Sequence, residues 1–329
     1  MVLVTGATGH IGNVLVKYLV ASGEKVRALY APGDDPSPLK GLQVEGREID
    51  ILDYEALRAA ITGVDIVFHL AGLISILPFH QKRVYDINVG GTENIIRACK
   101  ETGVRKLLYV SSIHAFEDKK RTLKMDERNA IDPAKTSGSY GKSKAIATLK
   151  VEEAVRDGLN AVIVCPTGVI GPYDYKLSEL GRLFIDVAKG SMPFSVKGAF
   201  DFVDVQDVAQ GILLAAKQGR TGERYILGGT QIEINELIGL IEKAVGTCRK
   251  RVVVPTGLAY FASFFTGLHA LIWKKKPRFT TYSISTVSMW NTYSHEKASR
   301  EIDYRPRPIE KTVRETLDWL RQEGHLSSR

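Results

Sequence analysis

The sequence predicts a doubly wound α/β fold, in which helices cover both faces of a parallel sheet and a smaller C-terminal lobe is interleaved with it. Three observations predict this fold. Short apolar runs alternate with amphipathic helical patterns over the first half of the chain, and a glycine-rich turn joins the first such pair. After Pro166 the alternation breaks at closely spaced glycines and prolines.

Each element follows from its own pattern. The first strand, 2–5, is a short apolar run, and apolar residues recur every three or four positions in the helix 11–22 behind it. The same patterns predict further strands at 25–29, 43–49, 65–70, 106–110 and 161–165, and further helices at 54–61, 81–102 and 140–157. Beyond these, a strand at 202–205 leads into a helix ending at 217, and helices are predicted at 235–245 and 309–322.

The predicted elements divide into two regions. Residues 1–170, with a returning segment at about 200–228, are expected to form the larger domain around the parallel sheet. Residues 171–199 and 229–329 are expected to form the smaller lobe.

The composition excludes several classes of protein. With 329 residues, 44% hydrophobic and 25% charged, the chain resembles folded globular proteins and not disordered ones. Its three cysteines have no spacing typical of a disulfide framework or a metal site. An apolar strand beginning at Val2 leaves no room for a secretory leader, so we expect a cytoplasmic protein without a bound metal. The net charge of +8 is scattered, which argues against nucleic-acid binding.

The turn after the first strand has the spacing GxxGxxG, with glycines at Gly6, Gly9 and Gly12. Glycine permits a tight turn and a close approach to a pyrophosphate, which the N-terminus of the next helix then binds. The turn therefore predicts a dinucleotide-binding, Rossmann-type domain and leaves the smaller lobe for a substrate. The residues expected at the phosphates are Gly6, Thr8, Gly9, His10, Ile11 and Gly12.

A second motif predicts the chemistry. Tyr140 and Lys144 lie four residues apart at the start of a predicted helix, so they share one face of it. A nearby ammonium favours the phenolate, which lets Tyr140 act as a general acid/base. Ser112 follows the carboxyl end of a parallel strand, where its hydroxyl can stabilise charge on a reacting oxygen. Ser111 is the alternative to Ser112.

Together these motifs resemble the extended short-chain dehydrogenase/reductase branch, the NAD-dependent epimerase/dehydratase superfamily. The resemblance implies an NAD(P)-dependent oxidoreductase with Ser112, Tyr140 and Lys144 as catalytic residues. Asn88 matches a helix position to which we assign a mainly structural role. The further cofactor contacts that the resemblance implies are Tyr30, Asp50, Ile51, Leu70, Ala71, Gly72, Asn88, Tyr140, Lys144, Pro166, Thr167 and Val169.

The choice of cofactor is expected at the end of the second strand, where an acid holds the ribose of NAD and an arginine the 2′-phosphate of NADP. Tyr30 occupies the family's acid position and Ala31 its arginine position. The missing acid removes a repulsion against the phosphate, so NADP is favoured over NAD.

Two departures from the sugar-nucleotide members bear on the substrate. Cys165 and Gly168 replace an arginine and an asparagine, and Phe200 stands where epimerases often place an arginine for substrate phosphates. The pattern is closer to dihydroflavonol reductases, 3β-hydroxysteroid dehydrogenases and hopanoid-associated epimerase-like proteins. The substrate contacts expected are Ile74, Ser112, His114, Tyr140, Gly168 and Phe200.

Three functions follow as hypotheses. The first is interconversion of a ketone and a secondary alcohol on a relatively apolar small molecule, with Tyr140 as the general acid/base. The second is epimerisation or dehydration of a nucleotide sugar through transient hydride transfer. The third is a non-catalytic NAD(P)-sensing or structural subunit, since a fold does not fix a function.

Two expectations concern partners. The predicted helices 81–102 and 140–157 match those through which family members often dimerise, so a homodimer is expected. Residues 256–273 are uncharged and are followed by Lys274, Lys275 and Lys276. A buried helix is the favoured interpretation of this stretch, and peripheral membrane contact through 256–278 is the alternative.

Overall fold

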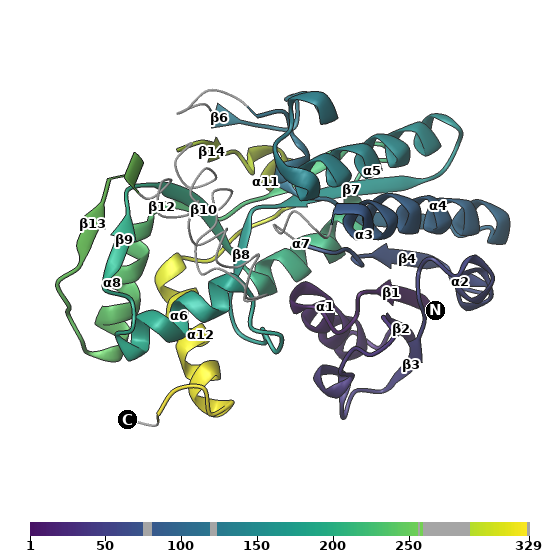
Figure 1. Ribbon diagram of the computed structural model, residues 1–329. Helices are drawn as coiled ribbons and strands as arrows, with labels where there is room; N and C mark the ends of the chain where they lie inside the picture. The colour runs from purple at the N-terminus through teal and green to yellow at the C-terminus, as the bar shows by residue number, and fades with distance from the viewer. Residues whose placement is uncertain (75–80, 119–123, 256, 259–289, 328–329) are drawn as a thin grey trace.

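The computed structural model describes residues 1–74, 81–118, 124–255, 257–258 and 290–327 (Figure 1). Within these ranges a seven-stranded parallel sheet has the strand order β11-β7-β5-β4-β1-β2-β3. Its strands are β1 (Val2–Thr5), β2 (Val26–Tyr30), β3 (Val44–Glu48), β4 (Ile66–His69), β5 (Lys106–Val110), β7 (Ala161–Pro166) and β11 (Arg224–Leu227). The predicted Rossmann-type fold is therefore confirmed.

Helices cover both faces of this sheet and bury its central strands, whereas the edge strand β3 is half-buried to exposed. Helices α1 (His10–Ala21) and α7 (Val205–Gln218) pack together on one face, and α2 (Tyr54–Ile61), α4 (Gly91–Thr102) and α5 (Gly138–Arg156) lie on the other. Alternate residues of β1 accordingly enter different cores: Val2 and Val4 pack with α1 and α7, and Leu3 packs with α2 and α4.

The helix predicted at 81–102 is interrupted. It consists of α3 (Gln81–Tyr85), a π-helical turn (Asp86–Gly90) and α4. A π-helical turn widens the helix by one residue per turn and often occurs at functional sites. Here it contains Asn88, whose side chain is buried.

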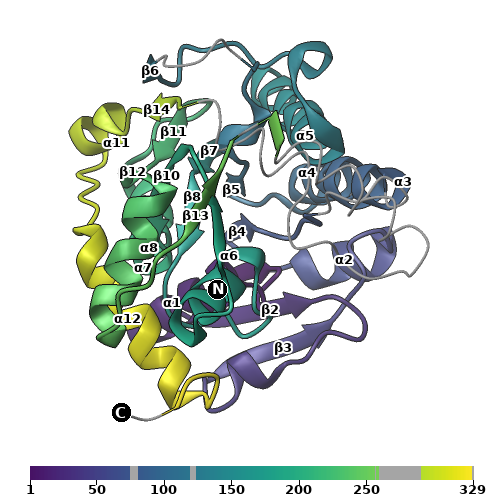
Figure 2. The same cartoon turned by 60° about the vertical axis from the view of Figure 1, so that its left-hand side comes forward.

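The smaller lobe is built on a three-stranded sheet of order β12-β10-β8, with β8 (Gly168–Ile170), β10 (Ala199–Asp204) and β12 (Thr230–Glu233). Helices α6 (Glu179–Lys189), α8 (Ile234–Val245) and α12 (Ile309–Gln322) lie on the side of the molecule away from α2, α4 and α5 (Figure 2). The shorter elements described are β6 (Lys124–Met125), β9 (Phe194–Val196), β13 (Val252–Val254), β14 (Thr292–Tyr293) and α11 (Glu296–Glu301).

The chain crosses between the seven-stranded and the three-stranded sheet more often than the predicted division at residues 170 and 200 implies. Strand β8 directly follows β7 of the large sheet but pairs with β10 of the small one. Strand β10 runs into α7, and β11 then returns to pair with β7. The lobe is therefore inserted into the larger domain in stages.

The lysine-flanked stretch 256–278 lies outside the described residues except for 257–258. Peripheral membrane contact through it stays a prediction that sedimentation with anionic vesicles can test. Among the helices that the structure describes, none combines the length and hydropathy that a membrane span requires.

Candidate active site and cofactor-binding cleft

The glycine turn after β1 leaves no space for side chains. Gly6 has φ +66°, and a Cβ on it would lie 2.9 Å from the backbone nitrogen of Ala71. A Cβ on Gly12 would overlap the carbonyl oxygen of Gly6. Gly9 is the N-cap of α1, and no side chain caps the first N–H groups of α1 or its positive dipole end. This arrangement is suited to a pyrophosphate.

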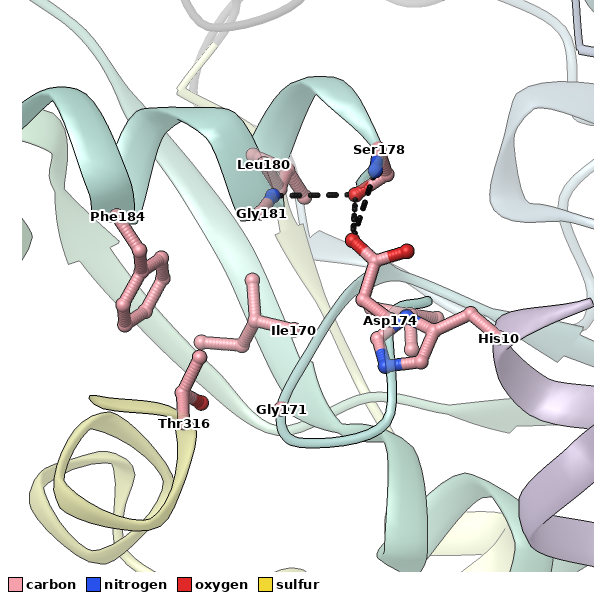
Figure 3. A pocket seen from close by; sticks show the side chains of 10 residues that line it. His10, Ile170, Gly171, Asp174, Ser178, Leu180, Gly181, Phe184 and Thr316 are labelled. Carbon is pink, nitrogen blue, oxygen red and sulfur yellow. Dashed lines mark hydrogen bonds between the residues drawn. The ribbon is translucent and has the colours of Figure 1, made fainter. Parts of the chain in front are cut away.

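His10 contributes only its backbone to this turn. Its imidazole Nε2 lies 3.0 Å from the carbonyl oxygen of Pro172, in the loop before α6. Burial lowers the pKa of His10, so the neutral ring donates this hydrogen bond. Figure 3 shows the side chain beside Asp174 and Ser178 in a small cavity next to α6, where it holds the lobe against the start of α1.

The turn after β4 is fastened to β1 by one hydroxyl. Thr5 Oγ1 accepts from the backbone N–H groups of Leu70, at 3.2 Å, and Ala71, at 3.0 Å. The same oxygen lies 2.9 Å from Nδ1 of buried His69. The predicted cofactor segment Leu70–Gly72 is thus held beside the glycine turn at the carboxyl ends of neighbouring strands, where doubly wound folds bind ligands.

The residues expected to contact the adenosine half of the cofactor make contacts within the protein through their side chains. Tyr30 ends β2, and its ring lies beside Gly46 of β3. Asp50 accepts a hydrogen bond from the backbone of Leu52 at 2.9 Å. The side chain of Ile51 packs directly on Gly91, so only its backbone is left to contact an adenine.

The phenol of Tyr140, the expected general acid/base, belongs to the first turn of α5. Burial raises the pKa of Tyr140 to about 12, and the nearby Ser112 hydroxyl offsets this only in part by favouring the phenolate. Ser111 is turned away, because its Oγ lies 2.7 Å from Oγ1 of Thr148 on α5. The geometry therefore favours Ser112 over Ser111 as the partner of the phenol.

Lys144 is held by the sheet. Its Nζ donates to the carbonyl oxygen of Val110, the last residue of β5, at 2.8 Å. Burial lowers the pKa of Lys144 to about 8. The sequence-based expectation was that the ammonium would lower the pKa of Tyr140, yet burial dominates at Tyr140 while Lys144 binds Val110.

Asn88 connects the turn after β4 to α5. Its Oδ1 accepts from the backbone N–H of Leu73 at 2.7 Å, and its Nδ2 donates to the Ser143 hydroxyl at 2.9 Å. A Cβ on Gly72 would lie 3.2 Å from this Oδ1 and 3.4 Å from the Nζ of Lys144. Asn88 thus holds the turn after β4 against α5, which is a structural contact of the kind expected of it.

Three further residues expected to contact the cofactor lie at and after the end of β7. Pro166 is its last residue, and the backbone N–H of Thr167 donates to Leu227 of β11 at 3.3 Å. Val169 follows, half-buried in β8. These three expected cofactor residues therefore lie where the chain passes from the large sheet to the small one.

Three of the expected substrate residues meet beside the phenol. The centroid of the His114 ring lies 6.1 Å from that of the Tyr140 ring, and the two rings pack edge to face. It also lies 6.1 Å from the centroid of the Phe200 ring, and these two rings are nearly parallel, with an interplanar angle of 15°. A Cβ on Gly168 would lie 2.8 Å from the Phe200 ring. Burial lowers the pKa of His114 to about 4, so this surface is uncharged at neutral pH. Ile74, by contrast, is 73% exposed.

One acid near the glycine turn escaped the sequence-based analysis. Oδ2 of Asp34 accepts from the Thr8 hydroxyl at 2.8 Å and from Nζ of Lys176 at 2.8 Å. Asp34 follows Gly12 by about 20 residues, the separation at which dinucleotide-binding folds place a ribose-binding acid. That separation is the signal in the sequence that indicates Asp34, whereas the resemblance to the family indicated position 30 for the acid.

Comparison with known proteins identifies the family. Residues 2–228 match the model of the NAD dependent epimerase/dehydratase family. The chain belongs to this family. Sterol demethylase protein B of Methylococcus capsulatus is 34% identical over 98% of this chain and 99% of its own length. A 4-hydroxy-2-methyl-3-oxo-4-farnesyl-3,4-dihydroquinoline-1-oxide ketoreductase of Stigmatella aurantiaca is 27% identical over 98% and 96%. The crystal structure of gox2253 is similar with a TM-score of 0.87 and 32% identity, covering 99% of both chains.

Membership of the epimerase/dehydratase family makes the chain an NAD(P)-dependent oxidoreductase of the extended short-chain dehydrogenase type. Its residues fit a nicotinamide dinucleotide. Gly6 and Gly12 allow the turn to pack closely on the segment after β4 and on its own backbone, which leaves the first N–H groups of α1 to meet a pyrophosphate, and Gly72 lets the turn after β4 lie against Lys144 and Asn88. Among the described residues, no three His, Cys, Asp or Glu side chains are grouped as metal ligands.

Proposed function

We propose that this enzyme interconverts a ketone and a secondary alcohol on a relatively apolar small molecule. The observation that carries the proposal is the aromatic surface of His114 and Phe200 beside Tyr140. A nucleotide-sugar diphosphate needs charge-assisted partners, and neither His114 nor Phe200, the described residues of this surface, carries a charge at neutral pH. The names of two relatives, which refer to a sterol and to a farnesylated ketone, support the same substrate class.

Different residues of this site have different roles in the proposed reduction. When bound, a reduced nicotinamide supplies the hydride. Tyr140 is protonated at neutral pH, because its pKa is about 12, and donates its proton to the carbonyl oxygen. The Ser112 hydroxyl hydrogen-bonds the same oxygen and stabilises the charge that develops on it. The aromatic surface holds the apolar body of the substrate and excludes water from the reacting carbonyl.

A substrate panel tests this proposal. Apolar cyclic and aryl ketones should oxidise NADH or NADPH stoichiometrically in the presence of the enzyme, and Tyr140→Phe should not support this reaction. The second candidate function is epimerisation or dehydration of a nucleotide sugar, which turns over without net change in the cofactor. Cofactor-neutral conversion of a nucleotide sugar, with no ketone reduced, would overturn the proposal.

The preference between NAD and NADP also depends on the charges near the cofactor. NADP was expected because Tyr30 and Ala31 supply no acid. Asp34, however, places a carboxylate against Thr8 in the glycine turn, which removes the reason for that expectation. The selection between NAD and NADP therefore depends on Asp34 and its partner Lys176.

For assembly we propose a homodimer formed through α4 and α5. These helices pack side by side, and three of their apolar residues, Ile96, Ile146 and Leu149, are only half-buried in the single chain. Light scattering should give twice the mass of one chain, and Leu149→Glu should yield monomers. A monomeric wild-type protein would contradict this proposal.

A further inference from the structure

Loops from the two lobes meet the glycine turn at one carboxylate oxygen. Asp34, in the loop after β2, accepts at Oδ2 from Thr8 of the glycine turn and from Lys176, in the loop between β8 and α6. The Thr8 side chain is almost fully buried, and the Asp34 and Lys176 side chains are 31% and 49% exposed. The ion pair is therefore open on one side to solvent, or to a ligand on the turn.

A specific turn returns the acid to this position. The backbone N–H of Asp34 donates to Ala31 at 3.0 Å, and Gly33 between them has φ +76°. With Pro32 as its second residue, this is the signature of a type II turn. The turn reverses the chain after β2, so that an acid four residues beyond the strand end lies at the glycine turn.

The position is that of the adenine ribose. In a Rossmann fold the pyrophosphate lies at the N-terminus of the first helix, and the ribose hydroxyls lie between the glycine turn and the end of the second strand. Asp34 contacts the first of these elements and is carried by the loop that leaves the second. Both of its hydrogen bonds use Oδ2, and within the described residues Oδ1 accepts none.

We propose that Asp34 selects NAD(H) over NADP(H), and that Lys176 of the substrate lobe positions it. Oδ1 accepts from the ribose hydroxyls of NAD, and the carboxylate repels a 2′-phosphate. An exposed ion pair contributes little to stability, so the effect of Lys176 is to fix the direction of the carboxylate. Lys176 could bind a 2′-phosphate itself only by leaving Asp34 and bringing that phosphate beside an unpaired carboxylate.

Binding constants of the free enzyme for NADH and NADPH, measured by calorimetry, test the selection without turnover. The wild type should bind NADH at least about tenfold more tightly than NADPH, a difference of about 1.4 kcal/mol. Asp34→Asn should invert this preference, because it removes the repulsion and leaves Lys176 free to meet the phosphate. A wild type that prefers NADPH would overturn the proposal.

Asp35 provides a matched control. It is the adjacent acid, and its carboxylate caps Ser37 through the backbone N–H at 2.9 Å and the hydroxyl at 2.6 Å. Asp35→Asn removes the same charge, also within the field of Lys176, without touching the contact to Thr8. It should leave the ratio of the two binding constants within about twofold of the wild type. Equal changes of the ratio in both variants would refute a specific role for Asp34.

The Lys176→Met variant tests whether Lys176 orients the Asp34 carboxylate or only links the two lobes. Alone, it should reduce the preference for NADH by a few-fold. Combined with Asp34→Asn, it should abolish the affinity for NADPH that the single variant gained, which a double-mutant cycle measures as coupling. If Asp34→Asn and Lys176→Met weaken both cofactors equally and lower the melting temperature of the free enzyme, the pair is only a tether and the proposal fails.

Discussion

A Cβ atom on Gly168 would lie 2.8 Å from Cε1 of Phe200, so the aromatic ring occupies the space that a side chain at 168 would need. Gly168→Ala should force the ring away from His114 and destabilise the fold by about 1–3 kcal/mol. We expect kcat/KM for an apolar ketone to fall about tenfold while NADH binding is unchanged.

Two further variants make this prediction specific. Gly239→Ala is the matched control, because nothing lies within 4 Å of a Cβ on this helical glycine, and it should be neutral or stabilising. Gly168→Ala combined with Phe200→Leu should recover part of the lost stability. An unchanged kcat/KM in Gly168→Ala would show that the position of the Phe200 ring does not affect the substrate.

The two adjacent serines should differ in function. Ser112→Ala removes the hydroxyl near the Tyr140 phenol that we propose stabilises charge on the reacting oxygen, and we expect kcat to fall about 10²–10³-fold. Ser111→Ala removes only the contact to Thr148, and should cost about 1 kcal/mol of stability with little loss of kcat. Steady-state kinetics and urea unfolding of both variants measure the difference. The reverse order of kcat values would make Ser111 the active serine.

Tyr140→Phe should lower kcat about 10²–10⁴-fold and leave the dissociation constant for NADH unchanged. The pKa of Tyr140 is about 12, so the proton required for ketone reduction stays on the phenol through neutral pH. Alcohol oxidation needs the phenolate instead, and its rate should rise with pH below that pKa. Ketone reduction should therefore be independent of pH through the neutral range while alcohol oxidation accelerates as pH rises, and a rate of oxidation that does not change with pH would indicate a different acid/base.

Acid should destabilise the fold through His69. Burial lowers its pKa from 6.5 to about 3, so below pH 6.5 the unfolded chain binds a proton that the folded one does not. Stability from this group is fully present above pH 6.5 and is lost as pH falls toward 3. From pH 7 to pH 5 the wild type should lose about 2 kcal/mol more than His69→Gln, as measured by urea unfolding. Identical losses would show that His69 is protonated in the folded state.

Most of the parallel sheet could be predicted, because the central strands are short apolar runs that alternate with amphipathic helices, whereas β11 was not predicted. The helix Ile309–Gln322 begins and ends where its pattern predicts. The π-helical turn at Asp86–Gly90 could not be predicted, since no local residue pattern distinguishes i→i+5 hydrogen bonding from the α-helical i→i+4 pattern. The pairing of β8 and β10 in a second sheet also carries no local signal.

The proximity of the candidate catalytic residues could be predicted, because motif spacing reports their placement on neighbouring elements, while their roles stay a prediction. Ser112 lies near Tyr140, and Asn88 links the turn after β4 to α5. The direction of the pKa change at Tyr140 could not, because burial depends on packing by residues distant in sequence. Asp34 was missed for a similar reason, since only the turn at Pro32 and Gly33 brings it back to Thr8.

Within the described residues the chain passes between the seven-stranded and the three-stranded sheet three times, from β7 to β8, from β10 through α7 to β11, and from β11 to β12. Exchange of the substrate lobe between relatives would thus need three compatible junctions at once, the last formed by Gly228 and Gly229. A Cβ on Gly229 would overlap the backbone of Phe202. New substrate ranges are therefore more accessible to point substitutions around Phe200 than to recombination of whole lobes.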